Sequence, residues 1–187
     1  MNQVIKIYKI VFMRPAKNFL VRGFTLVETL IYIAIIGGIL ATFISFSLNI
    51  SGAHNKTYVI QEVQANARVA LDVISQKIQS ANGVTTSSSV FNIDPGKLFL
   101  TMSSTTLNPT IINLSDNDGA LQIKEGTGAT TTITTSQIRV TNLQFTNLSA
   151  SSTHANIKIN LTVEFATTTD INFQYAQSLE TAVSARE

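Results

Sequence analysis

The chain has 187 residues, of which 44% are hydrophobic and 13% are charged, and its formal net charge is +2. It contains no cysteine, which excludes disulfide bonds and thiolate metal sites. The positive charge is concentrated, since residues 1–23 carry five basic residues and no acidic one, while the rest carries eight basic and eleven acidic residues. Beyond residue 23 the formal charge is therefore near −3, which gives no support for nucleic-acid binding.

Residues 1–23 have the basic character of a targeting segment that takes no part in the fold. Positively charged flanks of membrane helices stay in the cytoplasm, so the bulk of the chain is expected on the other side. The segment contains a second methionine, Met13, and a start there would leave an eleven-residue leader. Both starting points remain open.

The stretch from Phe24 to Ile50 contains one charged residue, Glu28, and no proline. About twenty consecutive apolar residues span a bilayer as a helix, so the stretch predicts a transmembrane helix. A carboxylate in such a helix costs roughly 3 kcal/mol and usually marks function. Glu28 either lies close enough to the interface to reach water or pairs with a cation. No Lys or Arg follows it within the span, so the cation would come from another chain or from a new amino terminus at Phe24.

Residues 23–28 have the sequence GFTLVE, with basic residues before them and an apolar helix after them. This combination resembles the processing motif of type IV pilins and type II secretion pseudopilins. The resemblance implies that a prepilin peptidase cleaves after Gly23 and N-methylates Phe24. It also implies that Glu28 acts in the assembly of subunits.

The pair Gly37-Gly38 is the weak point of the apolar helix, because two glycines cost roughly 2 kcal/mol of helix propensity relative to alanine. Close packing against a neighbouring helix is one explanation. The resemblance implies another, since pilin-like helices can extend locally on assembly. Many of them carry a helix-breaking proline at the position of Ser45, which leaves Gly37-Gly38 as the candidate for such flexibility here.

The helix is predicted to continue to about Asn82, with a possible bend near Ser51-Gly52, because apolar residues recur at three- and four-residue spacing. Asn82-Gly83 is typical of a helix C-terminus. The expected apolar stripe contains Ile60, Val63, Ala67, Ala70, Leu71, Ile74, Ile78 and Ala81.

From Val84 onward, short β-branched runs alternate with Ser, Thr, Asn, Asp and Gly, which predicts a β-rich head. The clearest alternation lies in 156–165, where one face is expected to be buried and the other wet. The expected strands are 90–93, 97–102, 110–114, 120–124, 130–134, 137–145, 156–165 and 171–176. A helix followed by a Thr/Ser-rich head is similar to minor pseudopilins of the J kind and related minor pilins.

No catalytic signature is present. His54 and His154 are the only histidines and are not spaced as zinc ligands, so both are interpreted as surface residues. Asp116 and Asp118 lie in the segment DNDG, whose oxygens are a weak candidate for calcium, although a plain turn is the favoured interpretation. We expect no enzymatic activity, no cofactor and no metal.

The expected fold class is α+β, with a long N-terminal helix packed on an antiparallel β-sheet head. The expected domains are 1–23 (leader), 24–50 (transmembrane half of the helix), 51–83 (amphipathic half) and 84–187 (head). The resemblance implies a structural pilus or pseudopilus subunit, and the J-like head favours a minor subunit over a major one. The implied partners are a prepilin peptidase, other subunits and an inner-membrane assembly platform. The alternative is a single-pass anchored binding or adhesion module that does not polymerise.

Overall fold

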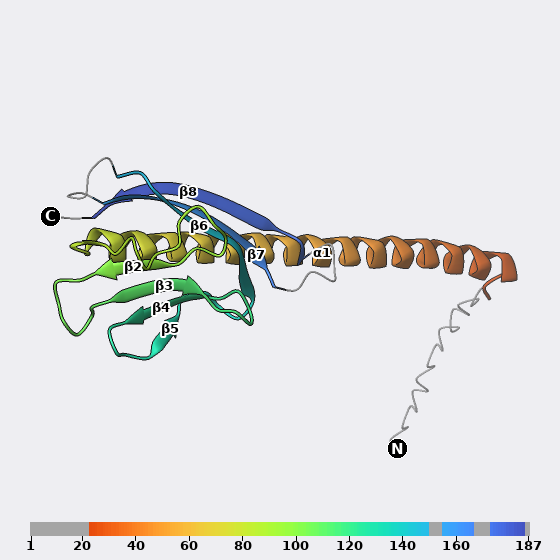
Figure 1. Cartoon of the computed structure of the whole chain (residues 1–187). Coiled ribbons are helices and arrows are strands. Elements are labelled where there is room, and N and C mark those ends of the chain that lie inside the picture. Colours follow the sequence, from red (N-terminus) through yellow and green to blue (C-terminus); the bar gives the residue numbers. More distant parts are fainter. Residues whose placement is uncertain (1–22, 150–154, 167–172, 186–187) are drawn as a thin grey trace, which may run out of the picture. The chain divides into compact units, whose positions relative to one another are not determined.

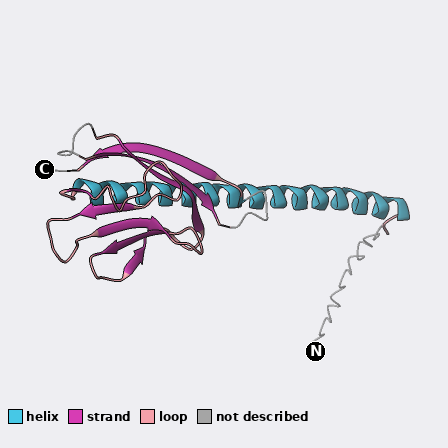
Figure 2. Cartoon of the chain, viewed as in Figure 1, coloured by secondary structure: helices cyan, strands magenta, loops and turns pink. Residues whose placement is uncertain are grey.

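The computed structural model describes residues 23–149, 155–166 and 173–185, and it places one long helix before eight strands (Figures 1 and 2). The described residues divide into two compact units, with the boundary between Ser45 and Phe46. Residues 1–22 of the predicted leader (1–23), and His154, lie outside the described residues. The α+β class, a long apolar helix with antiparallel sheet, is confirmed.

Helix α1 spans Leu26–Gln79 and passes through Gly37-Gly38 and Ser51-Gly52 without interruption. It ends three residues before the predicted Asn82. The reason is that the chain turns after Gln79, and the Asn82 N–H donates a hydrogen bond of 2.9 Å to the Thr101 carbonyl in a neighbouring strand. The backbone group at Asn82 is therefore used by the sheet and not by the helix.

The head contains two antiparallel sheets. The first has the order β1-β2-β3-β4-β5, and the second has the order β6-β7-β8. The strands are β1 (Gly83–Val84), β2 (Leu98–Thr101), β3 (Thr110–Leu114), β4 (Leu121–Glu125), β5 (Thr130–Thr132), β6 (Ile138–Asn147), β7 (Asn156–Phe165) and β8 (Ala176–Ser184).

The second half of α1 supplies one wall of the head's core. Its buried stripe matches the predicted spacing, with Val59 fully buried where Ile60 was expected and with Leu71 only partly buried. In β7 the predicted alternation is confirmed, since every second side chain is buried. The fully buried side chains of the stripe are Val59, Val63, Ala67, Ala70, Ile74 and Ile78.

Polar side chains also fix α1 to the head. Asn66 Oδ1 accepts a hydrogen bond of 3.1 Å from the Thr135 N–H. Lys77 Nζ lies 2.6 Å from Glu125 Oε1 on β4. Asn66 lies near the middle of the buried stripe and Lys77 near its end, so the two contacts restrict sliding of the helix along the sheet.

Two strand predictions are wrong. Residues 90–93 form only an isolated bridge between Val90 and Lys97, because Asn92 has a left-handed φ of 59° that no regular strand accommodates. The last strand was expected to end at Ala176, but β8 begins there and continues to Ser184.

The turn between β4 and β5 requires glycine at position 126. Gly126 has a φ of 53°, and a Cβ atom there would overlap the backbone carbonyl oxygen of Thr106. We expect Gly126→Ala to lower the free energy of unfolding by about 2–3 kcal/mol, measured by thermal unfolding of the full chain in detergent. Gly83→Ala is the matched control, because a Cβ there meets nothing within 4 Å. Equal effects of the two substitutions would refute this account of the turn.

Candidate functional site

The start of α1 is organised by Thr25, which caps the helix. Its Oγ1 accepts a hydrogen bond of 3.2 Å from the Glu28 N–H, and its carbonyl oxygen accepts one of 3.1 Å from the Thr29 N–H. Gly23 and Phe24 precede the helix and are exposed. The bond between Gly23 and Phe24 therefore lies in non-helical, accessible backbone.

Glu28 lies in the first turn of α1, where the helix dipole favours a negative charge. It is half-buried, whereas every other residue from 23 to 45 is exposed. Its Oε1 accepts a hydrogen bond of 3.2 Å from the hydroxyl of Tyr32, one turn further along the helix. The ring of Tyr32 meets that of Phe24 edge to face, with centroids 5.9 Å apart.

Thr25 and Tyr32 were missed as site residues in the sequence, although both left a signal. Thr25 and Glu28 have the three-residue spacing of a capping box. Tyr32 follows Glu28 by four residues, so the two side chains share one face of the helix. The structure thus brings Phe24, Thr25, Glu28 and Tyr32 together at one helix end.

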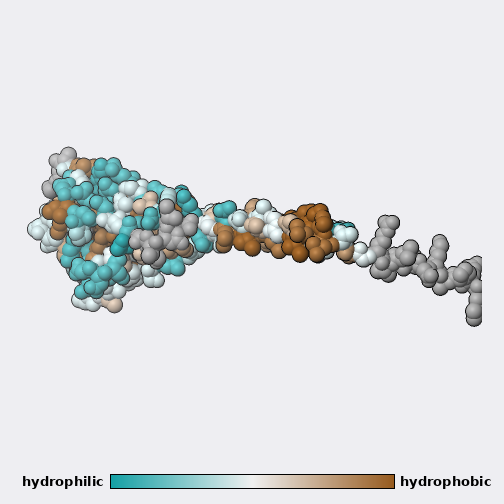
Figure 3. All heavy atoms as spheres, turned by 90° about the vertical axis from the view of Figure 1, so that its right-hand side faces the viewer, coloured by the Kyte–Doolittle hydropathy of each residue, from teal (hydrophilic) through white to brown (hydrophobic). Residues whose placement is uncertain are grey.

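The apolar part of α1 is not buried by the part of the chain that the structure describes. By length and composition, α1 is long and apolar enough to cross a membrane, and no other helix among residues 23–149, 155–166 and 173–185 is. Figure 3 shows apolar side chains concentrated on this part of the chain. Gly37 and Gly38 are helical, and a Cβ at either would meet nothing within 4 Å, so no part of the described chain explains them by close packing.

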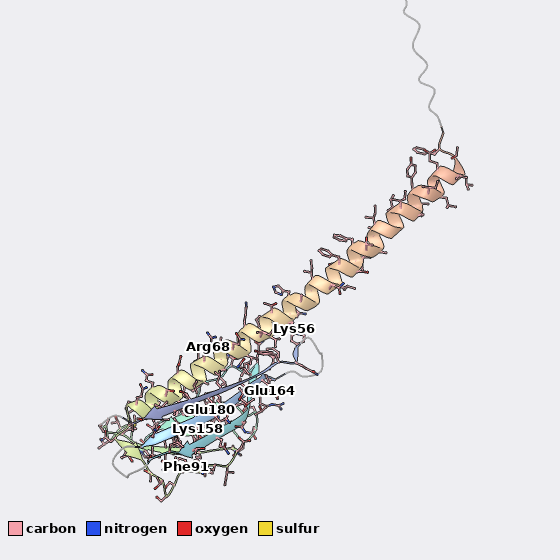
Figure 4. All side chains as sticks on the ribbon, turned by 90° about the horizontal axis from the view of Figure 1, so that it is seen from above. Lys56, Arg68, Phe91, Lys158, Glu164 and Glu180 are labelled. Carbon is pink, nitrogen blue, oxygen red and sulfur yellow. The ribbon has the colours of Figure 1, made fainter. Side chains whose placement is uncertain are left out.

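Several cations of the head are paired with acids. Arg139 on β6 donates to Glu164 on β7. Lys158 on β7 lies 2.8 Å from Glu180 on β8, and both residues are labelled in Figure 4. Lys97 lies over the ring of Phe99, 5.0 Å from its centroid. Pairing of this kind leaves less free positive charge for phosphate groups, in line with the acidic balance of the sequence.

Asp116 and Asp118 lie in the turn between β3 and β4. The pKa of Asp118 is below its ordinary value, because the Ser115 side chain and the Ala120 N–H both donate hydrogen bonds to its carboxylate. Asp118 thus stabilises the turn, and both Asp116 and Asp118 are exposed. No group of three or more His, Cys, Asp or Glu suited to a metal occurs among the described residues. The calcium hypothesis remains untested.

A cavity of about 500 Å³ opens beside α1, β4 and β5. Val73, Ile123 and Ile133 supply apolar walls, and the ion pair of Lys77 with Glu125 lies along it. The cavity combines apolar walls with charged groups, and no sequence pattern indicated it.

A scan against protein-family models and searches of curated proteins and of solved structures found no match to this chain. Any assignment of function therefore rests on the residues themselves.

Proposed function

We propose that this protein is a membrane-anchored, pilin-like structural subunit of a type IV pilus or type II secretion pseudopilus, with a minor role at the tip or in initiation. It would be processed by a prepilin peptidase and assembled with other subunits through an inner-membrane platform. We propose no enzymatic activity and no nucleic-acid ligand.

One observation carries this proposal. The sequence GFTLVE lies where accessible backbone passes into an apolar helix whose surface is not buried by its own chain. The Gly23–Phe24 bond lies outside the helix, so a peptidase can reach it without unwinding a hydrogen-bonded turn. The adjoining carboxylate, Glu28, is the charged residue of the predicted span.

The proposed mechanism has three steps. The basic leader holds the N-terminus in the cytoplasm while the helix inserts, which leaves the head outside. Cleavage after Gly23 and methylation give Phe24 a cationic amine. Glu28 then pairs with the amine of a neighbouring subunit, which penalises misaligned packing because an unpaired buried charge is costly. Flexibility at Gly37-Gly38 would let the helix adjust to its neighbours.

Gly23→Val is expected to block cleavage, so that the purified chain keeps residues 1–23. The physical reason is that a peptidase that binds the backbone around glycine has no space for a branched side chain. The measurement is the intact mass of the protein expressed together with a prepilin peptidase.

Gly37→Val is the matched control. Among the described residues, a Cβ at Gly23 or at Gly37 meets nothing within 4 Å, so both positions are open within the subunit. A difference in cleavage between the two variants then reports recognition by the peptidase. Cleavage of Gly23→Val at the rate of Gly37→Val would rule out the proposed site.

The cavity beside Lys77 and Glu125 favours one alternative, an anchored binding module that does not polymerise. Such a protein would keep its leader, α1 would serve as a static anchor, and the head would bind a ligand with apolar and charged groups. Retention of residues 1–23 in the native membrane distinguishes this function from the first.

A further inference from the structure

Tyr32 contacts both residues on which the proposed assembly step depends. Its hydroxyl donates to Glu28 Oε1 over 3.2 Å, and its ring lies against Phe24 with an interplanar angle of 75°. Phenylalanine at this position would keep the ring contact but not the hydrogen bond. The hydroxyl is therefore the part of Tyr32 that serves Glu28.

A carboxylate close to lipid needs hydrogen-bond donors from the protein, because the bilayer core supplies no water. The hydroxyl of Thr29, the next residue in the chain, donates instead to the Thr25 carbonyl over 3.2 Å. Thr25 Oγ1 is itself an acceptor from the Glu28 N–H. Among the described residues, the side-chain hydrogen bond to the Glu28 carboxylate comes from Tyr32.

We infer that Tyr32 is a positioning residue for Glu28, an inference that rests on the proposed role of Glu28 in assembly. The hydroxyl engages Oε1 and so fixes the rotation of the carboxylate. A carboxylate has a second oxygen, which remains able to accept a hydrogen bond from a cationic amine. Tyr32 thereby holds Glu28 ready for a neighbouring subunit, before that subunit arrives.

The contact itself is tested without assembly. The full chain is labelled with ¹³C at tyrosine Cζ and studied by NMR in detergent, with the Tyr32 resonance assigned by its loss in Tyr32→Phe. We expect Glu28→Ala to move this resonance and to leave those of Tyr58 and Tyr175 unchanged. A Tyr32 resonance that does not move would overturn the inference, whatever the function of the chain.

The use of the contact is tested by incorporation into filaments. Tyr32→Phe is expected to be cleaved normally and to be incorporated about fivefold less than wild type, the factor expected for one lost hydrogen bond. Tyr58→Phe is the control, because the Tyr58 hydroxyl donates to Gln137 in the head, 2.8 Å away. Equal incorporation of Tyr32→Phe and Tyr58→Phe would overturn the positioning role. Normal incorporation of Glu28→Ala would instead overturn the role of Glu28 in assembly, whereas a wild-type chain that is absent from filaments would overturn the proposed function.

Discussion

Replacement of Glu28 by alanine is expected to leave cleavage after Gly23 intact and to lower incorporation into filaments by a hundredfold or more. Removing one partner of a buried ion pair leaves the other charge uncompensated, at a cost of about 3–5 kcal/mol. Each 1.4 kcal/mol corresponds to about tenfold in an equilibrium constant, which gives the expected factor. The measurement is the fraction of processed subunit recovered in sheared filaments.

Thr42→Ala is the matched control for this experiment. Thr42 also lies in the apolar part of α1, but its hydroxyl bonds the carbonyl oxygens of Gly38 and Ile39 in its own helix. Its removal takes a polar group from the same segment without leaving a charge unpaired. If Glu28→Ala is incorporated as efficiently as Thr42→Ala, then Glu28 has no part in assembly.

Phe145→Ala is expected to lower the free energy of unfolding of the head by about 3–5 kcal/mol, the usual cost of removing a fully buried aromatic ring. Phe145 lies opposite Ile159 in the register of β6 with β7. Its ring approaches Gly96 so closely that a Cβ there would lie 2.9 Å from it. Thermal unfolding of the full chain in detergent is expected to shift down by roughly 15 °C.

The control for this prediction is Phe99→Ala, the same chemical change on β2. Phe99 is half-buried, beneath the ammonium group of Lys97. Its loss removes less apolar contact and should cost less than half as much. If both variants lose the same stability, the core does not lie where the burial of Phe145 places it.

The most periodic segments of this sequence could be predicted well. Strands 110–114 and 156–165 have the predicted bounds, because apolar and polar residues alternate in 156–165 and turn residues follow the β-branched run in 110–114. The helix and its buried stripe were also predicted, because a long apolar run followed by apolar residues at three- and four-residue spacing fits a helix and not a strand.

The remaining elements depend on contacts that local pattern does not encode. In β8 the inward positions are Gln177, Leu179, Thr181 and Val183, of which two are polar, so the alternation is weak. Strand β5 ends at Thr132, and beyond it the buried Thr134 uses its hydroxyl to accept a hydrogen bond from the Leu121 N–H. The division of the strands into two sheets follows from such long-range pairing.

At the candidate site, Gly23, Phe24 and Glu28 could be named from a short motif, whereas Tyr32 could not. Tyrosine in an apolar helix is ordinary by composition, and its four-residue spacing from Glu28 gains meaning only when the hydroxyl is seen to reach the carboxylate. The cavity beside Lys77 was beyond prediction for a similar reason, because its walls come from residues about fifty positions apart.

The central claim is most directly tested by the N-terminal mass of the protein purified from its native membrane. The account predicts a chain that begins at N-methylated Phe24 and lacks residues 1–23. A chain in which Gly23 is still joined to Phe24 would contradict it. In that case α1 would be a static membrane anchor for the head.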